Sequence, residues 1–217
     1  MPLFQMRNLI LISLLIILIF PCSYAWAMAP DSGLVKGNRE IKWTPVFPEN
    51  FRKGLFRMTF DISKNHVTGF LMIKKTSDSS TSIVFTNEFG ICFFYFEFCK
   101  GKFLIRTLFP SFDRKSLLSL LEKDFRLILF PDTTIKKIKV IKNPDGDIQN
   151  YKVSSCRGNY QYYITIQTKK IKEIRSMHTI FRKTIISLKQ YYADIPWMIN
   201  IFHPVQKLRI KLTYLSP

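Results

Sequence analysis

The stretch from Ser82 to Leu108 constrains the fold of this chain more than any other part of its sequence. It reads SIVFTNEFGICFFYFEFCKGKFLIRTL, a nearly continuous series of aromatic and β-branched residues. Its breaks are Gly90 and the Lys100-Gly101-Lys102 turn. Because the first residue types favour strands and glycine favours turns, the stretch predicts a β-meander.

The central strand of this meander is apolar on most of both faces, because side chains alternate between the faces of a strand. One face carries Cys92, Phe94, Phe96 and Phe98. The other face carries Ile91, Phe93, Tyr95 and Glu97. We therefore expect other elements to cover one face and the opposite face to line an apolar space. No catalytic constellation accompanies the strand, so the pattern favours an apolar interior over a reaction centre.

Residues 1–27 have the three-part pattern of a secretory signal peptide. Arg7 is the one charge of the first block, residues 9–20 form an apolar run, and Pro21 ends that run ahead of small residues. The run is shorter than the ~20 apolar residues that cross a bilayer, so a permanent transmembrane helix is the weaker interpretation. The sequence therefore predicts an exported protein of the cell envelope.

Two modes of processing remain open. Cleavage after Ala25 or Ala27 would release a soluble periplasmic protein. Lipidation at Cys22 would instead remove residues 1–21 and anchor an outer-membrane lipoprotein that faces the periplasm. Pro21 argues against lipidation, because the residue before a lipidated cysteine is normally small.

The chain is strongly basic, with 33 Lys and Arg against 15 Asp and Glu and a net charge of +18. For an exported protein, the polyanions within reach are mainly lipid head groups and anionic glycolipids. We therefore expect an anionic membrane surface, and no nucleic acid, as a partner. The alternative is that lysines at alternate strand positions only form a solvated face.

Three cysteines would remain after removal of the leader. Cys92 and Cys99 cannot bridge each other, because seven residues of one strand at ~3.3 Å each place them too far apart. Cys156 could pair with either of them. No CxxC motif or nearby histidine accompanies the cysteines, so we expect no metal site and no cofactor. The histidines are predicted to be surface or turn residues: His66, His178 and His203.

Two further segments complete the predicted organisation. Residues 28–50 are polar and contain prolines, which predicts an extended arm, with Trp43 as its anchor, ahead of a single domain over 51–217. Apolar residues at helical spacing predict a helix over 113–130. Its expected start is a cap at Ser111 or Asp113, and its expected stop is Pro131.

Alternating apolar and polar residues predict about a dozen strands around that helix. The last strand, residues 207–215, is the clearest example. The chain is therefore predicted to be mainly β with one or two helices, as a curved antiparallel sheet that forms an incomplete barrel with a helical lid. It lacks GxGxxG, GxxxxGK[ST], GxSxG and HExxH motifs, so the nucleotide-binding, hydrolase and metalloprotease classes that these motifs mark are disfavoured.

The order of elements over about residues 54–215 resembles the LolA/LolB-like fold of bacterial lipoprotein-localisation factors. Three fragments add to this likeness: Val67-Thr68-Gly69-Phe70-Leu71, Phe85-Thr86-Asn87-Glu88-Phe89-Gly90, and Ser187-Leu188-Lys189-Gln190-Tyr191-Tyr192 followed by Ile195-Pro196. The resemblance implies a half-barrel with helical lids and an apolar cavity that accepts the acyl chains of lipoproteins. It also favours the form that is anchored at Cys22.

These observations predict a non-enzymatic envelope protein that binds acyl chains or a lipidated partner, with the helix over 113–130 as a gate. The sequence does not decide which strand face lines the cavity. The candidate lining residues are Phe56, Met58, Phe60, Leu71, Phe94, Phe96, Phe98, Tyr162, Ile164, Ile199, Leu208 and Ile210.

Two alternatives remain. The first is an envelope lipoprotein with a structural or interaction role, in which the core is filled and the basic surface contacts anionic lipid or protein. The second is an enzyme, for which no two acids are convincingly paired by their spacing. The acids best placed near apolar segments are Asp61, Glu88, Glu97, Asp124 and Asp194. Of these, Glu97 is expected to form a salt bridge with Lys100 or Lys102.

Overall fold

The chain divides into two units, Met1–Gly33 and Leu34–Pro217. The computed structural model describes residues 44–63, 65–130, 135–141, 146–155, 157–176, 183–192 and 194–216, all in the second unit. The predicted leader, the lipidation candidate Cys22, the anchor Trp43 and Cys156 lie outside these residues.

The described part of the chain is mainly β, as predicted. Its strands are β1 (Lys53–Ile62), β2 (Asn65–Ser77), β3 (Ser80–Thr86), β4 (Cys92–Cys99), β5 (Lys102–Leu108), β6 (Ile135–Ile141), β7 (Ile148–Ser155), β8 (Gly158–Thr165), β9 (Ile171–Ser176), β10 (Ile185–Tyr192), β11 (Ile195–His203) and β12 (Leu208–Ser216). A 3-10 turn, η1 (Pro110–Phe112), and the helix α2 (Lys115–Leu129) lie between β5 and β6.

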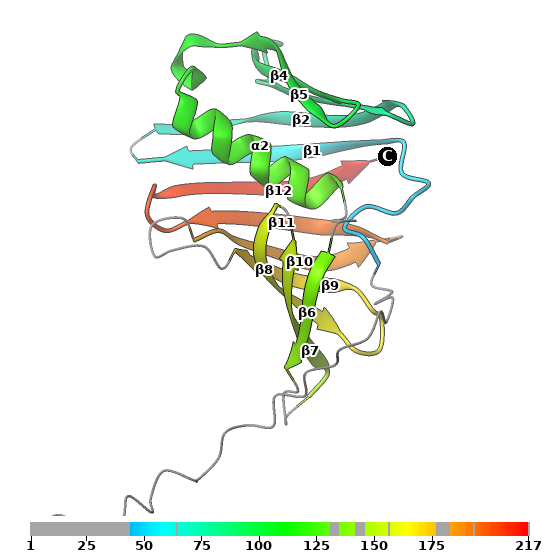
Figure 1. Cartoon of the computed structure of the whole chain (residues 1–217). Coiled ribbons are helices and arrows are strands. Elements are labelled where there is room, and N and C mark those ends of the chain that lie inside the picture. The colour runs from blue at the N-terminus through cyan, green and yellow to red at the C-terminus, as the bar shows by residue number, and fades with distance from the viewer. Residues whose placement is uncertain are drawn as a thin grey trace, which may run out of the picture. The chain divides into compact units, whose positions relative to one another are not determined.

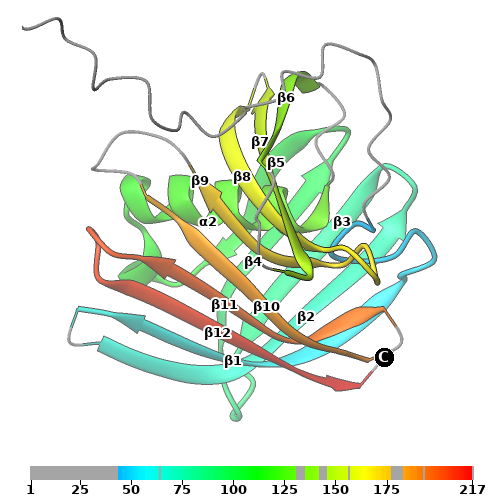
Figure 2. The same ribbon diagram turned by 90° about the horizontal axis from the view of Figure 1, so that it is seen from below.

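All twelve strands form one antiparallel sheet in the order β5-β4-β3-β2-β1-β12-β11-β10-β9-β8-β7-β6. The first and last strands of the fold pair with each other in the middle of the sheet, and β5 and β6 are its two free edges. The sheet therefore does not close into a barrel. Helix α2, which connects the two edge strands in sequence, crosses the sheet over β2, β1 and β12 (Figure 1), and the sheet curls round it (Figure 2). The prediction of an incomplete barrel with a helix is confirmed.

Strict alternation of side chains places one apolar set on the concave face. In β1, Phe56, Met58 and Phe60 are buried whereas Arg57 is exposed. Pairing keeps this set in register, because Phe56 lies opposite Leu71 of β2 and Tyr214 of β12, both of which are buried. Side chains of the same parity therefore form a continuous apolar surface across the strands.

Gly69 of β2 is required by a close approach of the backbone. A Cβ atom at this position would lie 2.1 Å from the carbonyl oxygen of Thr86, at the end of β3. Any side chain would therefore push the β3–β4 connection off β2.

The second face of β4 was predicted to be aromatic near its start, acidic at Glu97 and in contact with an apolar space. The structure differs from this prediction in two respects. A β-bulge lies at Phe93. Phe85 of β3 pairs with Phe94, and the residue after it, Thr86, pairs with Cys92, so Phe93 has no partner in β3. The bulge turns the Phe93 ring towards the concave face, where it lies 5.1 Å from the ring of Phe85. The convex face of β4 is polar at Glu97, which accepts hydrogen bonds, so it does not line an apolar space.

The expected helix cap was also wrong. Ser111 lies within η1, and the N-cap of α2 is Arg114, which makes no side-chain capping hydrogen bond. Phe112 of η1 is buried against the ring of Phe60, 5.1 Å away, so packing fixes where the helix begins. The helix ends at Leu129, two residues before Pro131, as predicted.

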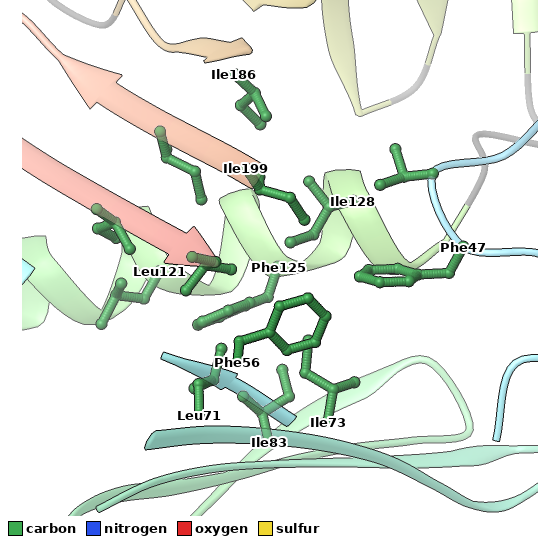
Figure 3. Close-up of a cluster of buried hydrophobic side chains, with 14 of the residues drawn as sticks. Phe47, Phe56, Leu71, Ile73, Ile83, Leu121, Phe125, Ile128, Ile186 and Ile199 are labelled. Atoms are coloured by element: carbon green, nitrogen blue, oxygen red, sulfur yellow. The ribbon is translucent and has the colours of Figure 1, made fainter. Parts of the chain in front are cut away.

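Residues 44–50 do not behave as a simple arm. Val46 and Phe47 are buried in the core, and the Phe47 ring lies 4.6 Å from that of Phe51. The described end of the predicted arm therefore packs against the open side of the sheet and helps to fill the space beside α2 (Figure 3).

Candidate functional site

The concave face of the sheet is the candidate site, and it brings together every predicted lining residue. Each of them is at most 4% exposed and belongs to one apolar cluster: Phe56, Met58, Phe60, Leu71, Phe94, Phe96, Phe98, Tyr162, Ile164, Ile199, Leu208 and Ile210. The structure thus resolves which parity faces inward. These residues were chosen only because they alternate with polar ones along the strands. The cluster shows that they share one apolar face, and ligand binding stays a prediction.

Helix α2 covers this face with one apolar stripe. Leu117, Leu121, Phe125 and Ile128 follow one another at helical spacing and are all buried. Leu121, Phe125 and Ile128 meet the side chains of the strands beneath them in Figure 3. Their spacing places them on one side of the helix, so the helix contributes a single face to the interior.

Aromatic rings make up much of the wall near the first strands. The rings of Phe94 and Phe96 stack with centroids 4.3 Å apart, and the ring of Phe125 from α2 lies 6.2 Å from that of Phe94. Aromatic pairs of this kind contribute about 0.5–1.5 kcal/mol beyond the area that they bury. The contact of the helix with the sheet is therefore dominated by apolar and ring packing.

Arg126 attaches the C-terminal end of the helix to the β4–β5 turn. Its guanidinium donates a hydrogen bond to the carbonyl oxygen of Gly101 at 3.0 Å and lies 4.9 Å from the centroid of the Phe98 ring. It also donates to Glu122 of the helix itself at 2.8 Å. These contacts lie at the edge of the interior rather than inside it.

One polar pair lies inside the contact between helix and sheet. His203 at the end of β11 and Asp124 of α2 are both buried, with Nε2 of the histidine 2.6 Å from Oδ2 of the aspartate. The other ring nitrogen, Nδ1, lies 3.2 Å from the hydroxyl of Thr184. Burial raises the pKa of Asp124, while the hydrogen bond and charge of His203 and the charge of Lys123 oppose this rise.

This pair was not predicted, and His203 is not the surface or turn residue that was expected. Thr184, His203 and Asp124 have the connectivity of a hydroxyl–imidazole–carboxylate relay. However, the imidazole is enclosed, so a substrate has no access to it in this arrangement. The available signal was Asp124 itself, because it is an acid three residues after Leu121 and four before Ile128 on the inward stripe.

The other acids considered for catalysis are dispersed and paired with bases. Asp61 contacts His66, Glu88 lies 3.7 Å from Arg57, and Asp194 lies 3.0 Å from Lys170. Glu97 accepts hydrogen bonds from Ser80 and Arg106, both at 2.8 Å, and these bonds lower its pKa. The expected salt bridge of Glu97 with Lys100 or Lys102 was therefore wrong, because Arg106 on β5 occupies that role.

Within the described residues, no group of three or more His, Cys, Asp or Glu side chains is arranged to hold a metal ion. Cys92 and Cys99 are free thiols, so neither forms the disulfide that was considered for Cys156. None of the helices in the described part of the chain has the length and apolar character needed to span a membrane.

The fold and its covered concave face define a class of half-barrel with a helix across its opening. No protein-family model matches the chain, and no curated protein matches it. A crystal structure of a LolA superfamily protein from Nitrosomonas europaea is similar to it, with 7% identity, a TM-score of 0.56, and coverage of 78% of this chain and 86% of that one. This chain therefore has a distant LolA-like fold.

Two further crystal structures match at a lower TM-score of 0.47. One is a DUF1329 family protein from Desulfovibrio piger, with 7% identity, and the other is an outer-membrane lipoprotein-sorting protein domain from Vibrio parahaemolyticus, with 5% identity. Both matches cover 77% of this chain and 85% of the other.

Proposed function

We propose that this chain is a non-enzymatic envelope protein that binds acyl chains, of lipids or of lipid-modified proteins, in the apolar interior beneath α2. One observation carries the proposal: a continuous apolar wall from most of the strands faces a single separate helix rather than a second sheet. The LolA-like fold supports it, because lipoprotein localisation is the function that the resemblance implies.

The helix α2 would act as a gate. The wall side chains have almost no exposed surface, so an acyl chain reaches them only if the helix moves aside. The four inward side chains of the helix would each contribute about 1.5–3 kcal/mol of burial, and an acyl chain of about 14 carbons would contribute about 0.8 kcal/mol per CH₂. These totals are similar in size. Replacement of the helix side chains by an acyl chain would therefore change the free energy of burial little, as reversible loading and release require.

A tip beside the start of α2 would contact the membrane surface. We define this aromatic tip as Phe89, Ile91 and Phe109, of which Phe89 is 90% exposed. Asn87 holds the tip in shape, because its side-chain oxygen accepts hydrogen bonds from the backbone N–H groups of Phe89 and Ile91. Several large apolar side chains that are exposed on one patch mark an interaction site, whereas a single one does not.

Basic residues would assist that contact. Arg114 and Lys115 are exposed at the start of α2, where they follow η1 and the exposed Asp113. The net charge of +18 adds a general attraction to anionic lipid that weakens as salt rises. The proposed partners are therefore acyl chains or a lipoprotein and an anionic membrane surface.

The test is lipid analysis of the protein purified from membranes of its host, followed by titration of the delipidated protein with a fluorescent fatty acid. We expect co-purified acyl lipid and saturable binding with a stoichiometry near one. Absence of both bound lipid and probe binding would contradict the proposal. That outcome would favour the second candidate, a structural or interaction protein with a filled core, which the complete burial of the wall residues also supports.

Lipidation at Cys22 is a further part of the proposal and needs its own test. A lipidated protein would partition into detergent and incorporate labelled palmitate, and Cys22→Ser would abolish both. Recovery of the intact wild type from a periplasmic extract without detergent, with an N-terminus at Trp26 or Met28, would instead favour cleavage after Ala25 or Ala27.

A further inference from the structure

The contact between Asp124 and His203 joins the gate helix to the sheet at a point that is otherwise apolar. Asp124 is the one acidic side chain that is fully buried among the described residues. Its partner comes from β11, and the third member, Thr184, directly precedes β10. The contact therefore links α2 to two neighbouring strands, and it must break when the helix lifts away.

The buried pair carries no net charge when it holds one titratable proton. A single proton between the imidazole and the carboxylate gives the pair either two neutral groups or a compensated ion pair, and both forms keep the 2.6 Å contact as a hydrogen bond. In both forms Nδ1 carries a hydrogen, because Nε2 takes part in the contact with Asp124, so the Thr184 hydroxyl accepts a hydrogen bond from Nδ1. Without that proton, Nε2–H of the neutral ring still donates to the carboxylate and the Thr184 hydroxyl donates to Nδ1, but the buried pair carries one uncompensated negative charge. With a second proton it carries one uncompensated positive charge, and burial of either charge is costly.

We propose that Asp124 and His203 form a pH-sensitive latch that holds α2 on the sheet, and that the latch releases as the pH rises above neutrality. The proposal rests on the function proposed above, because it regulates the same gate. It assigns the stability of the closed gate to the proton content of this pair.

The direction follows from the number of protons in the two states. In the open state both groups are in water, where a histidine titrates at about 6.5 and an aspartate at about 3.9. Between these values the open pair also holds one proton, so closure is independent of pH. Above about 6.5 the open pair loses its proton, whereas closure without that proton buries an uncompensated negative charge, so opening increases by up to about tenfold per pH unit. Below about 3.9 the open pair gains a second proton, so opening increases again.

Among the described residues that flank the pair, none provides a competing titration. Lys123 of the same helix is exposed, and its charge opposes the rise in the pKa of Asp124 that burial causes. From β12, the residue opposite His203 is the apolar Leu208. From the segment before β10, Thr184 is uncharged and its neighbour Lys183 is exposed. The proton content is therefore assigned to Asp124 and His203.

The test is hydrogen exchange of the backbone amides of α2 in the full chain between pH 5 and pH 9, corrected for intrinsic exchange rates. The amides of β1, in the middle of the sheet, serve as the internal reference. We expect protection of α2 to be constant relative to β1 up to about pH 6.5 and then to fall by up to about tenfold per pH unit. Parallel protection of α2 and β1 across the whole range would overturn the proposal.

The variant Asp124→Asn gives a second readout, because the pH dependence of helix opening is expected to reverse its direction. Its closed state would hold a neutral imidazole and its open state would be protonated below about pH 6.5, so opening would increase on acidification and be constant above that value. An unchanged alkaline slope in this variant would also overturn the latch. Asp61→Asn is the matched control, because Asp61 contacts His66 in an exposed pair between β1 and β2, and its profile should match that of the wild type. If Asp124→Asn does not fold, the comparison of α2 with β1 in the wild type still decides the question.

Hydrogen exchange separates this proposal from the proposed function, because it needs no lipid. An alkaline release of α2 without any acyl binding would support the latch and contradict the lipid-binding function. Acyl binding without a pH-dependent release of α2 would support the lipid-binding function and contradict the latch.

Discussion

The guanidinium of Arg126 lies over the ring of Phe98, with its central carbon 4.9 Å from the ring centroid. The same side chain donates a hydrogen bond to Gly101 in the β4–β5 turn, so one residue fastens the last turns of α2 to the sheet. The helix is thereby held at both ends of its apolar stripe, by Phe112 before its start and by Arg126 near its end.

Replacement of Arg126 by alanine is expected to loosen the gate. The variant loses a cation–π contact and a hydrogen bond, which together contribute about 1–2 kcal/mol to the free energy of unfolding. We expect faster exchange of the amides at the end of α2 and faster uptake of a fluorescent fatty acid. Lys123→Ala, on the exposed side of the same helix, is the control, and an equal effect of both substitutions would contradict this role.

Leu121→Ala distinguishes a gate from an ordinary packing helix. Removal of this buried side chain costs about 2–5 kcal/mol of unfolding free energy in either case, because it leaves a cavity under the helix. If the interior accepts acyl chains, the weaker closed state and the new space should increase affinity for the fatty acid probe. A loss of stability without any gain in probe binding would favour the filled core. Met72→Ala, on the outer face of β2, should change stability and binding little.

Phe89→Ser tests the aromatic tip. Because the side chain is 90% exposed, the substitution should change the unfolding free energy by no more than about 0.5 kcal/mol. We expect weaker co-sedimentation with vesicles of anionic phospholipid, and the loss should persist at high salt because the removed contact is apolar. Ile166→Ser, in the β8–β9 turn, is the matched exposed control. Equal vesicle binding of Phe89→Ser and the wild type would exclude the tip as a membrane contact.

Gly69→Ala should be among the most destabilising single-methyl additions in the described chain. The new Cβ would lie 2.1 Å from a backbone carbonyl oxygen, so β3 and the loop that carries Phe89 must shift. Addition of atoms to a tightly packed position costs about 1–3 kcal/mol, and here the neighbour is backbone rather than a flexible side chain. Gly101→Ala is the comparison, since its φ of +77° is strained for alanine but the site is open, with an expected cost of about 1 kcal/mol. Denaturant unfolding that ranks Gly101→Ala as the more harmful would contradict this account.

Local periodicity was sufficient to predict the sheet, the helix and the apolar wall. The alternation in β1 and β12 fixed the inward set once one face was known to be buried, and the stripe from Leu117 to Ile128 has a helical period. In such segments the same residues decide both local structure and burial, so the pattern along the chain carries the information.

Long-range contacts account for what could not be predicted. The bulge at Phe93 depends on the register that β3 imposes on β4, and the start of α2 depends on where Phe112 packs. Asp124 and His203 are 79 residues apart in sequence and meet only because β11 passes beneath the helix. Asp124 lies on the inward stripe of the helix, so its burial could be predicted, but nothing in the sequence pattern identifies His203 as its partner.

The pairing of β1 with β12 has a consequence for how the chain folds. Partners such as Phe56 and Tyr214 are joined only after the last strand is available, because β12 is the link between β1 and the later half of the sheet. Hairpins within β1–β5 and within β6–β12 form from local contacts, whereas this central pairing must close a loop of nearly the whole domain. Assembly of the sheet is therefore expected to be slow, and its two halves would stay unjoined until β12 is available.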